Sequence, residues 1–418
     1  MILLPVITLA LGWQLGASYE NQALQETRRQ VELFAPASGS GQLLHDPEHE
    51  ANLSLFWGVW RLLLTQYIAP DDLNSQKMVI GATEGMVRAV GDPYTVFMAP
   101  DETREFRQSL SGQLQGIGAE LSLKEGAVVV MHPLKGSPAE AAGLLPGDVI
   151  LTVDGKEIEG KTLAEVVGII RGPKGTSVVL SVARPGKDEP MSLTIVRADI
   201  TVPSVETKTL KTGSGMIGYI ALNQFGDTSV VEFTKALKEA LKDPPKAIII
   251  DLRFNGGGYL EGAIDIVSLF VQQGNVVSVE RRGGVSEPHE VRGHALAPEI
   301  PMVVLINQGS ASASEIVAGA LQDYDRATII GVKSYGKGSV QEVIDLPSAT
   351  SLRLTTARWL TPKGRSIAKQ GITPDVVVDR TPEQMQKDVD PQLDAAEVWL
   401  LGHRDALMKM KTGSGVTK

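Results

Sequence analysis

The stretch Asn307-Gln-Gly-Ser-Ala-Ser-Ala-Ser-Glu-Ile316 separates two apolar segments of different character. Before it, residues 302–306 form a short apolar run that is typical of a buried strand. After it, Glu315 precedes the apolar run 316–321, which predicts the start of a helix. Small hydroxyl residues therefore lie at a strand-to-helix junction, where the first backbone N–H groups of the helix have no intrahelical partner and could face a developing oxyanion.

A second loop, Gly331-Val-Lys-Ser-Tyr-Gly-Lys-Gly-Ser-Val-Gln341, carries a lysine between two glycines and ends on a glutamine. A serine hydroxyl needs a positioned base to act as a nucleophile at neutral pH. Lysine can be that base when burial lowers its pKa, because desolvation disfavours the ammonium form. The flanking glycines allow a tight loop around Lys337, and the amide of Gln341 can accept a hydrogen bond from the lysine amine. The two segments together predict a serine nucleophile with a lysine general base.

Three serines, Ser310, Ser312 and Ser314, compete for the role of nucleophile, and residue chemistry alone does not choose among them. Serine is also favoured at helix N-termini, so a capping cluster without catalytic function is the alternative interpretation. A Ser-His-Asp triad that uses His289 or His294 is a further alternative, although neither histidine lies in a recognisable catalytic or metal-binding motif.

Both segments resemble those of the C-terminal processing peptidases, also called tail-specific proteases. In that family the middle serine of the Ser-Ala-Ser-Ala-Ser string is the nucleophile, which corresponds to Ser312. The family's lysine lies 25 positions further on and its glutamine four beyond that, which matches Lys337 and Gln341. The resemblance also implies that the backbone N–H groups of Gly258 and Ala313 form an oxyanion hole.

The glycine-rich turn Asp251-Leu-Arg-Phe-Asn-Gly-Gly-Gly258 resembles the same family and follows the buried-strand pattern of residues 247–251. Successive glycines let the backbone approach a substrate closely, and an ordinary tight turn is the alternative. We expect Asp251 and Arg253 to be structural, as a charged pair that holds the core.

Residues 113–199 resemble a PDZ domain across the whole span, most specifically in Pro138-Ala-Glu-Ala-Ala-Gly-Leu-Leu-Pro-Gly-Asp148. Short apolar segments predict strands there, and residues 163–170 predict a short amphipathic helix. A PDZ domain adds an extended peptide to a sheet edge and captures its terminal carboxylate with backbone N–H groups. A simple turn built on two glycines is the alternative for the segment that matches the carboxylate-binding loop, which comprises Gly116, Ile117, Gly118 and Ala119.

Arg171 follows the predicted PDZ helix and precedes a turn that Gly172 and Pro173 favour. It is a candidate sensor of PDZ occupancy that contacts the substrate end or the protease core. A solvated arginine without such a role is the alternative.

Composition is ordinary for a soluble globular protein: 418 residues, 43% hydrophobic and 21% charged. The chain has no cysteine, which excludes disulfides, thiolate nucleophiles and Cys-ligated metals. It has no His-Glu-x-x-His motif, and its net charge of −9 argues against non-specific binding to nucleic acid. We therefore expect neither a metal nor another cofactor.

Residues 1–19 carry no charged side chain, and their apolar run at 2–13 is slightly short for a membrane span. Small residues at 16–18 suit signal cleavage, but no basic segment precedes them. We interpret 1–19 as a signal anchor or signal peptide, with a hydrophobic helix of a soluble protein as the alternative. The resemblance favours export, so the expected location is extracytoplasmic, in the periplasm or cell envelope, with the N-terminus holding the protein at the membrane.

The expected fold class is α+β and multidomain: an α/β, ClpP/crotonase-like protease core with an inserted PDZ domain and a helical N-terminal part. Residues 55–64 carry aromatic and apolar side chains at helical spacing, and we expect this stripe to pack in the core. After the segment 1–19, the predicted parts are a linker at 20–50, the helical region 51–112, the PDZ domain 113–199, the serine protease core 200–380, and a C-terminal helix and tail at 381–418.

The resemblance, which covers roughly residues 51–380, implies a serine endopeptidase that recognises proteins by their accessible, apolar C-terminal tails. Ser312 would attack the peptide carbonyl, Lys337 would accept its proton and return it to the leaving amine, and Gln341 would orient the lysine. An adaptor protein and a second copy of the chain are further candidate partners. Two other classes stay open: a proteolytically inactive PDZ scaffold, which the intact Ser–Lys–Gln set disfavours, and a thioester-directed acyl-transfer enzyme, which the PDZ domain disfavours.

Overall fold

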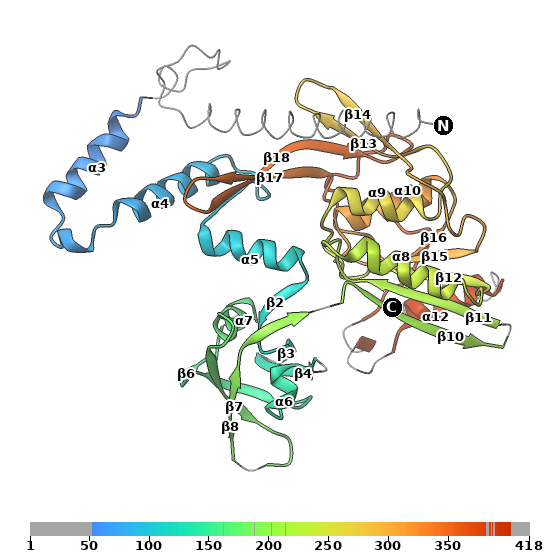
Figure 1. Cartoon of the computed structure of the whole chain (residues 1–418), viewed down its shortest axis with the longest axis horizontal. Helices are drawn as coiled ribbons and strands as arrows, with labels where there is room; N and C mark the ends of the chain where they lie inside the picture. Colours follow the sequence, from blue (N-terminus) through green and yellow to red (C-terminus); the bar gives the residue numbers. More distant parts are fainter. Residues whose placement is uncertain are drawn as a thin grey trace, which may run out of the picture. The chain divides into compact units, whose positions relative to one another are not determined.

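The computed structural model describes residues 52–402 except 125, 135, 162, 188, 202, 214, 382, 383, 386 and 388. The predicted signal segment 1–19, the linker 20–50 and the tail beyond residue 402 lie outside the described residues. The chain separates into two compact units, residues 1–79 and residues 80–418. Helices and strands both occur throughout the larger unit, so the fold is multidomain and α+β, as predicted (Figure 1).

The described part of the first unit is helical, with α3 (Ser54–Gln66), a 3-10 turn (Pro70–Asp72) and the start of α4 (Ser75–Arg88). The two helices confirm the predicted helical spacing, but the prediction that the aromatic stripe packs in the core is wrong. No residue of α3 is buried, and Leu55 and Trp57 are 77% and 49% exposed. The rings of Phe56, Trp57 and Trp60 contact one another, with centroids 5.0–6.2 Å apart. The spacing of the apolar residues correctly predicts an apolar helix face, but it does not predict whether another element packs against that face.

The centre of the second unit is a six-stranded sheet in the order β10-β11-β12-β15-β16-β19. β10 is antiparallel to β11, and the other neighbours are parallel. Every residue of β12 and of β15 is buried, which is the pattern of parallel strands covered on both faces. The strands are β10 (Val205–Thr212), β11 (Gly215–Leu222), β12 (Ala247–Asp251), β15 (Met302–Ile306), β16 (Thr328–Gly331) and β19 (Val376–Val377).

Helices cover both faces of this sheet, and alternate strand residues face opposite layers. Ile248 and Ile250 belong to a core shared with the first helical layer, which comprises α8 (Ser229–Ala240), α9 (Leu260–Ser268) and α10 (Ala313–Asp323). Ile249 belongs instead to a second core, together with Ala395 and Ala396 of α12 (Pro391–Leu400). The strand ends that precede the glycine turn and the serine segment are therefore held rigidly from both sides.

A second, antiparallel sheet adds its apolar side chains to the core of the first helical layer. Its long strand β18 pairs with β1 through residues 351–353, with β13 through residues 357–360, and with β17 along the other edge. Buried Trp359 of β18 and Val277 of β13 anchor this sheet to the helices. The strands are β1 (Val96–Met98), β13 (Asn275–Arg281), β14 (Ser286–Glu290), β17 (Ser339–Leu346) and β18 (Thr350–Leu360), and α5 (Pro100–Leu110) follows β1.

Residues 113–201 fold as a small sheet domain with its own hydrophobic core, whose most buried members include Val166 and Leu180. Its sheet has the order β3-β4-β5-β7-β8, with β6 on β5, and β2 pairs separately with β9. Its elements are β2 (Gln113–Gly116), β3 (Ala119–Lys124), β4 (Ala127–Pro133), α6 (Pro138–Ala141), β5 (Val149–Val153), β6 (Lys156–Glu157), α7 (Leu163–Ile170), β7 (Ser177–Ala183), β8 (Met191–Val196) and β9 (Ala198–Thr201). The predicted strands and the helix at 163–170 are present, and β2 and β3 are separated by Ile117 and Gly118. Gly118, at φ 73°, lies at this break, where the chain changes direction.

None of the helices in the described ranges is both long enough and apolar enough to cross a membrane.

Candidate active site

Ser312 lies at the turn between β15 and α10, directly before the first helical residue, Ala313. Its backbone has φ 55° and ψ −115°, a region that a non-glycine residue occupies only when its surroundings impose it. The cost of such a conformation is about 1–3 kcal/mol. The tight strand-to-helix turn presents the serine at the helix N-terminus, as the sequence predicts.

The structure distinguishes the three candidate serines. Ser310 is fully buried, and its hydroxyl donates to the carbonyl of Leu252 at 2.8 Å. Ser314 is also fully buried, and its hydroxyl donates to the carbonyl of Asn255 at 2.8 Å. Ser312 is only half-buried. Two of the serines therefore attach the helix start to the glycine turn, and the middle one is left accessible to a substrate.

The glycine turn packs directly against Ser312. A Cβ atom on Gly257, which has φ 99°, would lie 2.8 Å from the Ser312 Cβ and 3.0 Å from the Ala313 nitrogen. Asn255 fixes the turn, because its carbonyl accepts a hydrogen bond from the Ala311 nitrogen at 3.0 Å and its side chain accepts one from the Gly257 nitrogen at 2.9 Å. Sequence reasoning missed the roles of Asn255 and Gly257. The triple glycine was the signal, but it did not show which glycine meets the serine.

Among residues that the structure describes, the two amides predicted to form an oxyanion hole have no hydrogen-bond acceptor. The Phe225 nitrogen donates to the Gly257 carbonyl at 3.0 Å, and the Tyr259 nitrogen donates to the Phe225 carbonyl at 2.8 Å. This pairing does not use the amide of Gly258, which lies between them in sequence. Ala313 is the first residue of α10, so its N–H has no intrahelical acceptor. Within the described residues, neither amide donates a hydrogen bond. The Ala313 amide lies at the positive end of α10, and an amide with no acceptor can donate to a developing oxyanion.

Glu315 joins the serine turn to the lysine loop, although the sequence indicated only a helix start there. Its side chain is fully buried. One carboxylate oxygen accepts hydrogen bonds from the backbone nitrogens of Ser312 at 2.8 Å and Lys337 at 2.9 Å. The other oxygen accepts from the Gly336 nitrogen and from the Ser334 hydroxyl, both at 2.6 Å. A single carboxylate therefore sets the backbone of the predicted nucleophile and the backbone of the predicted base relative to each other.

Lys337 is half-buried in this loop, and its pKa is lowered. Burial is the main cause, and the positive charge of Arg353 adds to it. The negative charges of Asp92 and Glu315 act in the opposite direction. The environment therefore makes the ammonium form less stable than it is in water, which is the direction that a general base requires.

The amine of Lys337 faces an aromatic ring. Its Nζ atom lies 5.0 Å from the centroid of Tyr94. No hydrogen bond joins Lys337 Nζ to the Ser312 hydroxyl, although both residues are in the described part of the chain. The two residues are thus on adjacent loops, with the lysine amine turned to Tyr94.

Gln341 lies on β17 opposite a one-residue irregularity of β18, where Val340 pairs with Ala357 but Gln341 pairs with Thr355. Its amide nitrogen donates to the Ser339 hydroxyl at 2.8 Å and to the Thr355 hydroxyl at 3.4 Å. Its contact with Lys337 stays a prediction, since no hydrogen bond connects the two side chains within the described residues.

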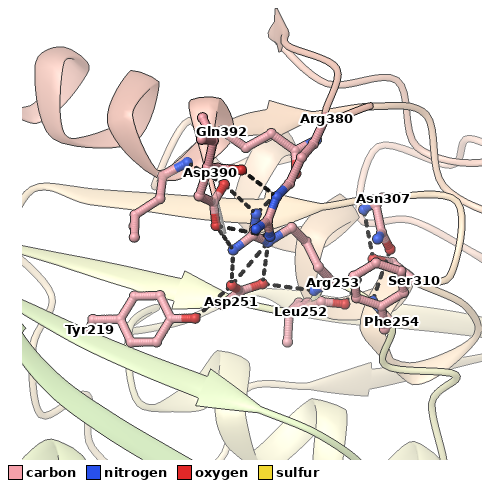
Figure 2. A network of polar contacts seen from close by, with 12 residues as sticks. Tyr219, Asp251, Leu252, Arg253, Phe254, Asn307, Ser310, Arg380, Asp390 and Gln392 are labelled. Atoms are coloured by element: carbon pink, nitrogen blue, oxygen red, sulfur yellow. Dashed lines mark hydrogen bonds and ion pairs between the residues drawn. The ribbon is translucent and has the colours of Figure 1, made fainter. Parts of the chain in front are cut away.

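A buried ionic network supports the strand end that precedes the glycine turn (Figure 2). Arg253 binds Asp251 at 2.6 Å and Asp390, at the start of α12, at 2.8 Å, and all three side chains are less than one-fifth exposed. Tyr219 donates its hydroxyl to Asp251 at 2.7 Å, and Gln392 accepts from Arg253 at 3.0 Å. Burial alone would raise the pKa of Asp390, but the hydrogen bonds from Arg253 hold it below its usual value. The pair Asp251–Arg253 is structural, as expected.

The histidine alternatives receive no support from the geometry. His289 is on β14, opposite Val277 of β13, and His294 lies on an exposed loop. Neither forms a hydrogen bond with Ser312 among the described residues. The described ranges also contain no group of three His, Asp or Glu side chains arranged to hold a metal ion.

The predicted carboxylate-binding loop borders a cavity of about 100 Å³ in the small sheet domain. Gly118 has φ 73°, and a Cβ atom there would lie 2.5 Å from the Ser137 Cβ, so only glycine fits. Arg171 is exposed and lines the same cavity. The structure therefore brings the loop and the candidate sensor together, and the rest of the lining is largely apolar, with Leu121, Leu134, Val167, Ile170 and Ile200.

Comparison with known proteins agrees with this arrangement. The peptidase family S41 matches residues 216–378, and a PDZ domain matches residues 129–184. The chain is 40% identical over 369 residues to the carboxy-terminal-processing protease of Bartonella bacilliformis, a match that covers 87% of this chain and 83% of that relative. It is 39% identical over 344 residues to a protein named as a CtpA-like serine protease in Staphylococcus aureus strain MRSA252, covering 82% of this chain and 68% of that relative.

Among solved structures, the photosystem II D1 C-terminal processing protease matches with a TM-score of 0.52 and 30% identity, and the match covers 79% of this chain and 89% of that one. The predicted family, enzyme class and PDZ-containing architecture are thereby confirmed. The chain belongs to the carboxy-terminal-processing proteases of peptidase family S41, and it is a serine peptidase with a PDZ domain.

Proposed function

We propose that Ser312 is the nucleophile and Lys337 the general base of this peptidase. The observation that carries the proposal is the shared carboxylate of Glu315, which holds the backbone of both residues at 2.8 and 2.9 Å. Ser312 is also the accessible member of the serine triplet, and burial lowers the pKa of Lys337. These features bear on the two requirements of the chemistry: a hydroxyl that a substrate can reach and a base whose ammonium form is disfavoured.

In the proposed reaction, the neutral amine of Lys337 moves from the Tyr94 ring to the Ser312 hydroxyl and accepts its proton as Oγ attacks the peptide carbonyl. The amides of Gly258 and Ala313 donate to the resulting oxyanion. Lys337 then gives the proton to the leaving amine, and a water molecule, activated in the same way, hydrolyses the acyl-enzyme. Gln341 orients the lysine while its amine faces the serine.

Protein substrates are selected by their C-terminal tails. The loop from Gly116 to Ala119 captures the terminal carboxylate, because a PDZ domain binds an extended peptide end with its backbone N–H groups. The apolar lining of the adjoining cavity, which includes Val167 and Ile170, supports a preference for apolar terminal residues. Arg171 lies on the same cavity, where it is placed to sense an occupied groove.

The protein acts outside the cytoplasm, in the periplasm or cell envelope, and residues 1–19 hold it at the membrane. The uncharged, apolar sequence of that segment supports this part of the proposal. The exposed apolar face of α3, with Leu55 77% exposed, supports a further contact with a second copy of the chain or with an adaptor protein. Cell fractionation and sedimentation of the full chain test the location and the assembly.

The decisive experiment incubates the full chain with an unstructured substrate protein whose tail ends in apolar residues. It compares wild type with Ser312→Ala and Lys337→Ala, and uses Lys333→Ala as the matched control, because Lys333 is an exposed lysine of the same loop. Each of the first two variants should lose roughly four to six orders of magnitude in kcat, while the control should retain activity. Equal cleavage by all four proteins would reject this assignment, and binding of the tail without any cleavage would favour an inactive PDZ scaffold.

A further inference from the structure

The turn that carries Tyr94 is fixed to strand β18. The carboxylate of Asp92 accepts hydrogen bonds from the Tyr94 nitrogen at 3.1 Å and from the Thr95 hydroxyl at 2.6 Å. The Thr95 hydroxyl in turn accepts from the Thr355 nitrogen at 3.1 Å, and Arg353 donates to the Tyr94 carbonyl at 3.2 Å. The turn that carries the Tyr94 ring is therefore held in place by its hydrogen bonds to β18.

Tyr94 is also braced against the lysine loop. Its hydroxyl donates to the hydroxyl of Tyr335 at 3.3 Å, and Tyr335 precedes Lys337 by two residues. The backbone nitrogen of Tyr335 donates to the Ser310 carbonyl at 3.1 Å, so the brace is continuous with the serine turn. The hydrogen bond to Tyr335, together with burial, raises the pKa of Tyr94 to about 12. The hydroxyl of Tyr94 is therefore harder to ionise than that of a free tyrosine.

The Lys337 Nζ atom lies 5.0 Å from the Tyr94 ring centroid, which is within the range where an aromatic ring attracts a cation. Three other charges face this lysine: Arg353 on β18, Asp92 on the turn and Glu315 on α10. Both carboxylates are already engaged by other donors, and no ion pair joins either of them to Lys337 among the described residues. The ring is thus the direct partner of the ammonium group.

We propose that Tyr94 is a positioning residue that holds the charged amine of Lys337 over its ring, away from Ser312, and so sets the pH at which the base becomes available. The inference rests on the proposed role of Lys337 as general base. A ring quadrupole attracts the ammonium form but not the neutral amine. Loss of the proton therefore releases the amine toward Ser312, and the ring keeps more lysine charged and withdrawn at low pH than burial alone would.

The test measures kcat/KM against pH for full-length wild type, Tyr94→Phe, Tyr94→Leu and Tyr94→Met. Phenylalanine retains the ring, whereas leucine and methionine keep an apolar side chain without one. Because the ring stabilises the ammonium, both ringless variants should move the acid limb of the profile to lower pH, by a few tenths to about 1.5 units. Tyr94→Phe should stay within a few tenths of a unit of wild type. Thermal unfolding identifies any variant that does not fold. If one ringless variant does not fold, the pH profile of the other tests the proposal.

A second readout is independent of catalysis. Lys337 is titrated by NMR with carbon-13-labelled lysine in a Ser312→Ala background, and its signal is assigned by loss in Lys337→Arg. The lysine pKa should fall when the ring is removed and hold when only the hydroxyl is removed. Unchanged or raised values in both ringless variants would overturn the proposal, as would equal shifts in Tyr94→Phe and Tyr94→Leu. If the Ser312→Ala protein still cleaves substrate, the proposed function fails, but this titration still decides what Tyr94 does.

Discussion

Replacing Glu315 with glutamine tests whether the buried carboxylate sets the geometry of the site. The carboxylate accepts four hydrogen bonds, two on each oxygen, and three of the four donors are backbone amides, from Ser312, Gly336 and Lys337. Glutamine keeps one acceptor oxygen and presents an NH2 group in place of the other. The Ser334 hydroxyl can rotate to accept a hydrogen bond from that NH2 group. At least one buried backbone N–H group would then point at the NH2 group, which is also a donor, and would lose its acceptor.

The loss of stability depends on how many of the four hydrogen bonds are lost. A hydrogen bond to a charged group contributes about 1.5–3 kcal/mol, and a buried donor left unsatisfied costs about 1–3 kcal/mol. Glu315→Gln should therefore lower the free energy of unfolding by about 2–5 kcal/mol. Because the same carboxylate holds Ser312 and Lys337, a displacement of either backbone by about 1 Å should also lower kcat roughly 100-fold.

The assay is urea unfolding of the full chain together with steady-state cleavage of an unstructured substrate. Glu239→Gln on α8 is the control, because its carboxylate forms an ion pair with Lys242 on the surface and is 69% exposed. Such a pair contributes about 0–1 kcal/mol, so the control should unfold and cleave like wild type. Wild-type stability and wild-type kcat in Glu315→Gln would refute the role assigned to this carboxylate.

Three further predictions concern the base, the glycine turn and the ionic network. Activity should rise with pH as Lys337 loses its proton, with an apparent pKa below 10.5. Arg353→Met should move this rise in activity to higher pH, because the arginine lowers the lysine pKa. A pH profile that is flat in wild type would argue against Lys337 as the general base. Gly257→Ala should lose at least about 100-fold in kcat, because its Cβ atom would lie 2.8 Å from that of Ser312, and tail binding measured by calorimetry should not change. Arg253→Met removes the ion pair of buried Asp251, while Asp390 keeps its contact with Arg380, and the change should cost about 3–5 kcal/mol in urea unfolding. Arg104→Met removes an exposed pair and should cost under about 1 kcal/mol, and equal costs would contradict a structural role for the network.

Local sequence signals account for much of the fold. The apolar runs at 247–251 and 302–306 predict buried strands, and both strands form with every residue buried. The serine triplet predicts a strand-to-helix turn, and α10 begins at Ala313, directly after the middle serine. These signals work because strand and helix formation depend on residues near in sequence.

The same local signals do not predict burial where it depends on contacts with segments that are distant in the sequence. The stripe on α3 has helical spacing, but spacing cannot report whether another element covers it, and Leu55 is exposed. For the same reason, the pattern at Glu315 indicated only a helix start. Its three partners in the lysine loop lie 19–22 residues further along the chain, and their approach depends on the parallel pairing of β15 with β16.

The strand β18 explains why the predicted catalytic group could not be completed from motifs alone. Thr355 donates through its backbone to Thr95 and accepts through its hydroxyl from Gln341, so one residue connects the Tyr94 turn to the predicted glutamine. The irregularity beside it changes the register between Val340 and Gln341, and a bulge of this kind redirects a side chain. The Tyr94 turn lies more than 200 residues before Gln341 and β18, so their contacts form only in the folded chain. The motifs therefore identify the predicted reacting groups, but the pKa of Lys337 depends on its burial and on Arg353 of β18, which only the folded chain brings together.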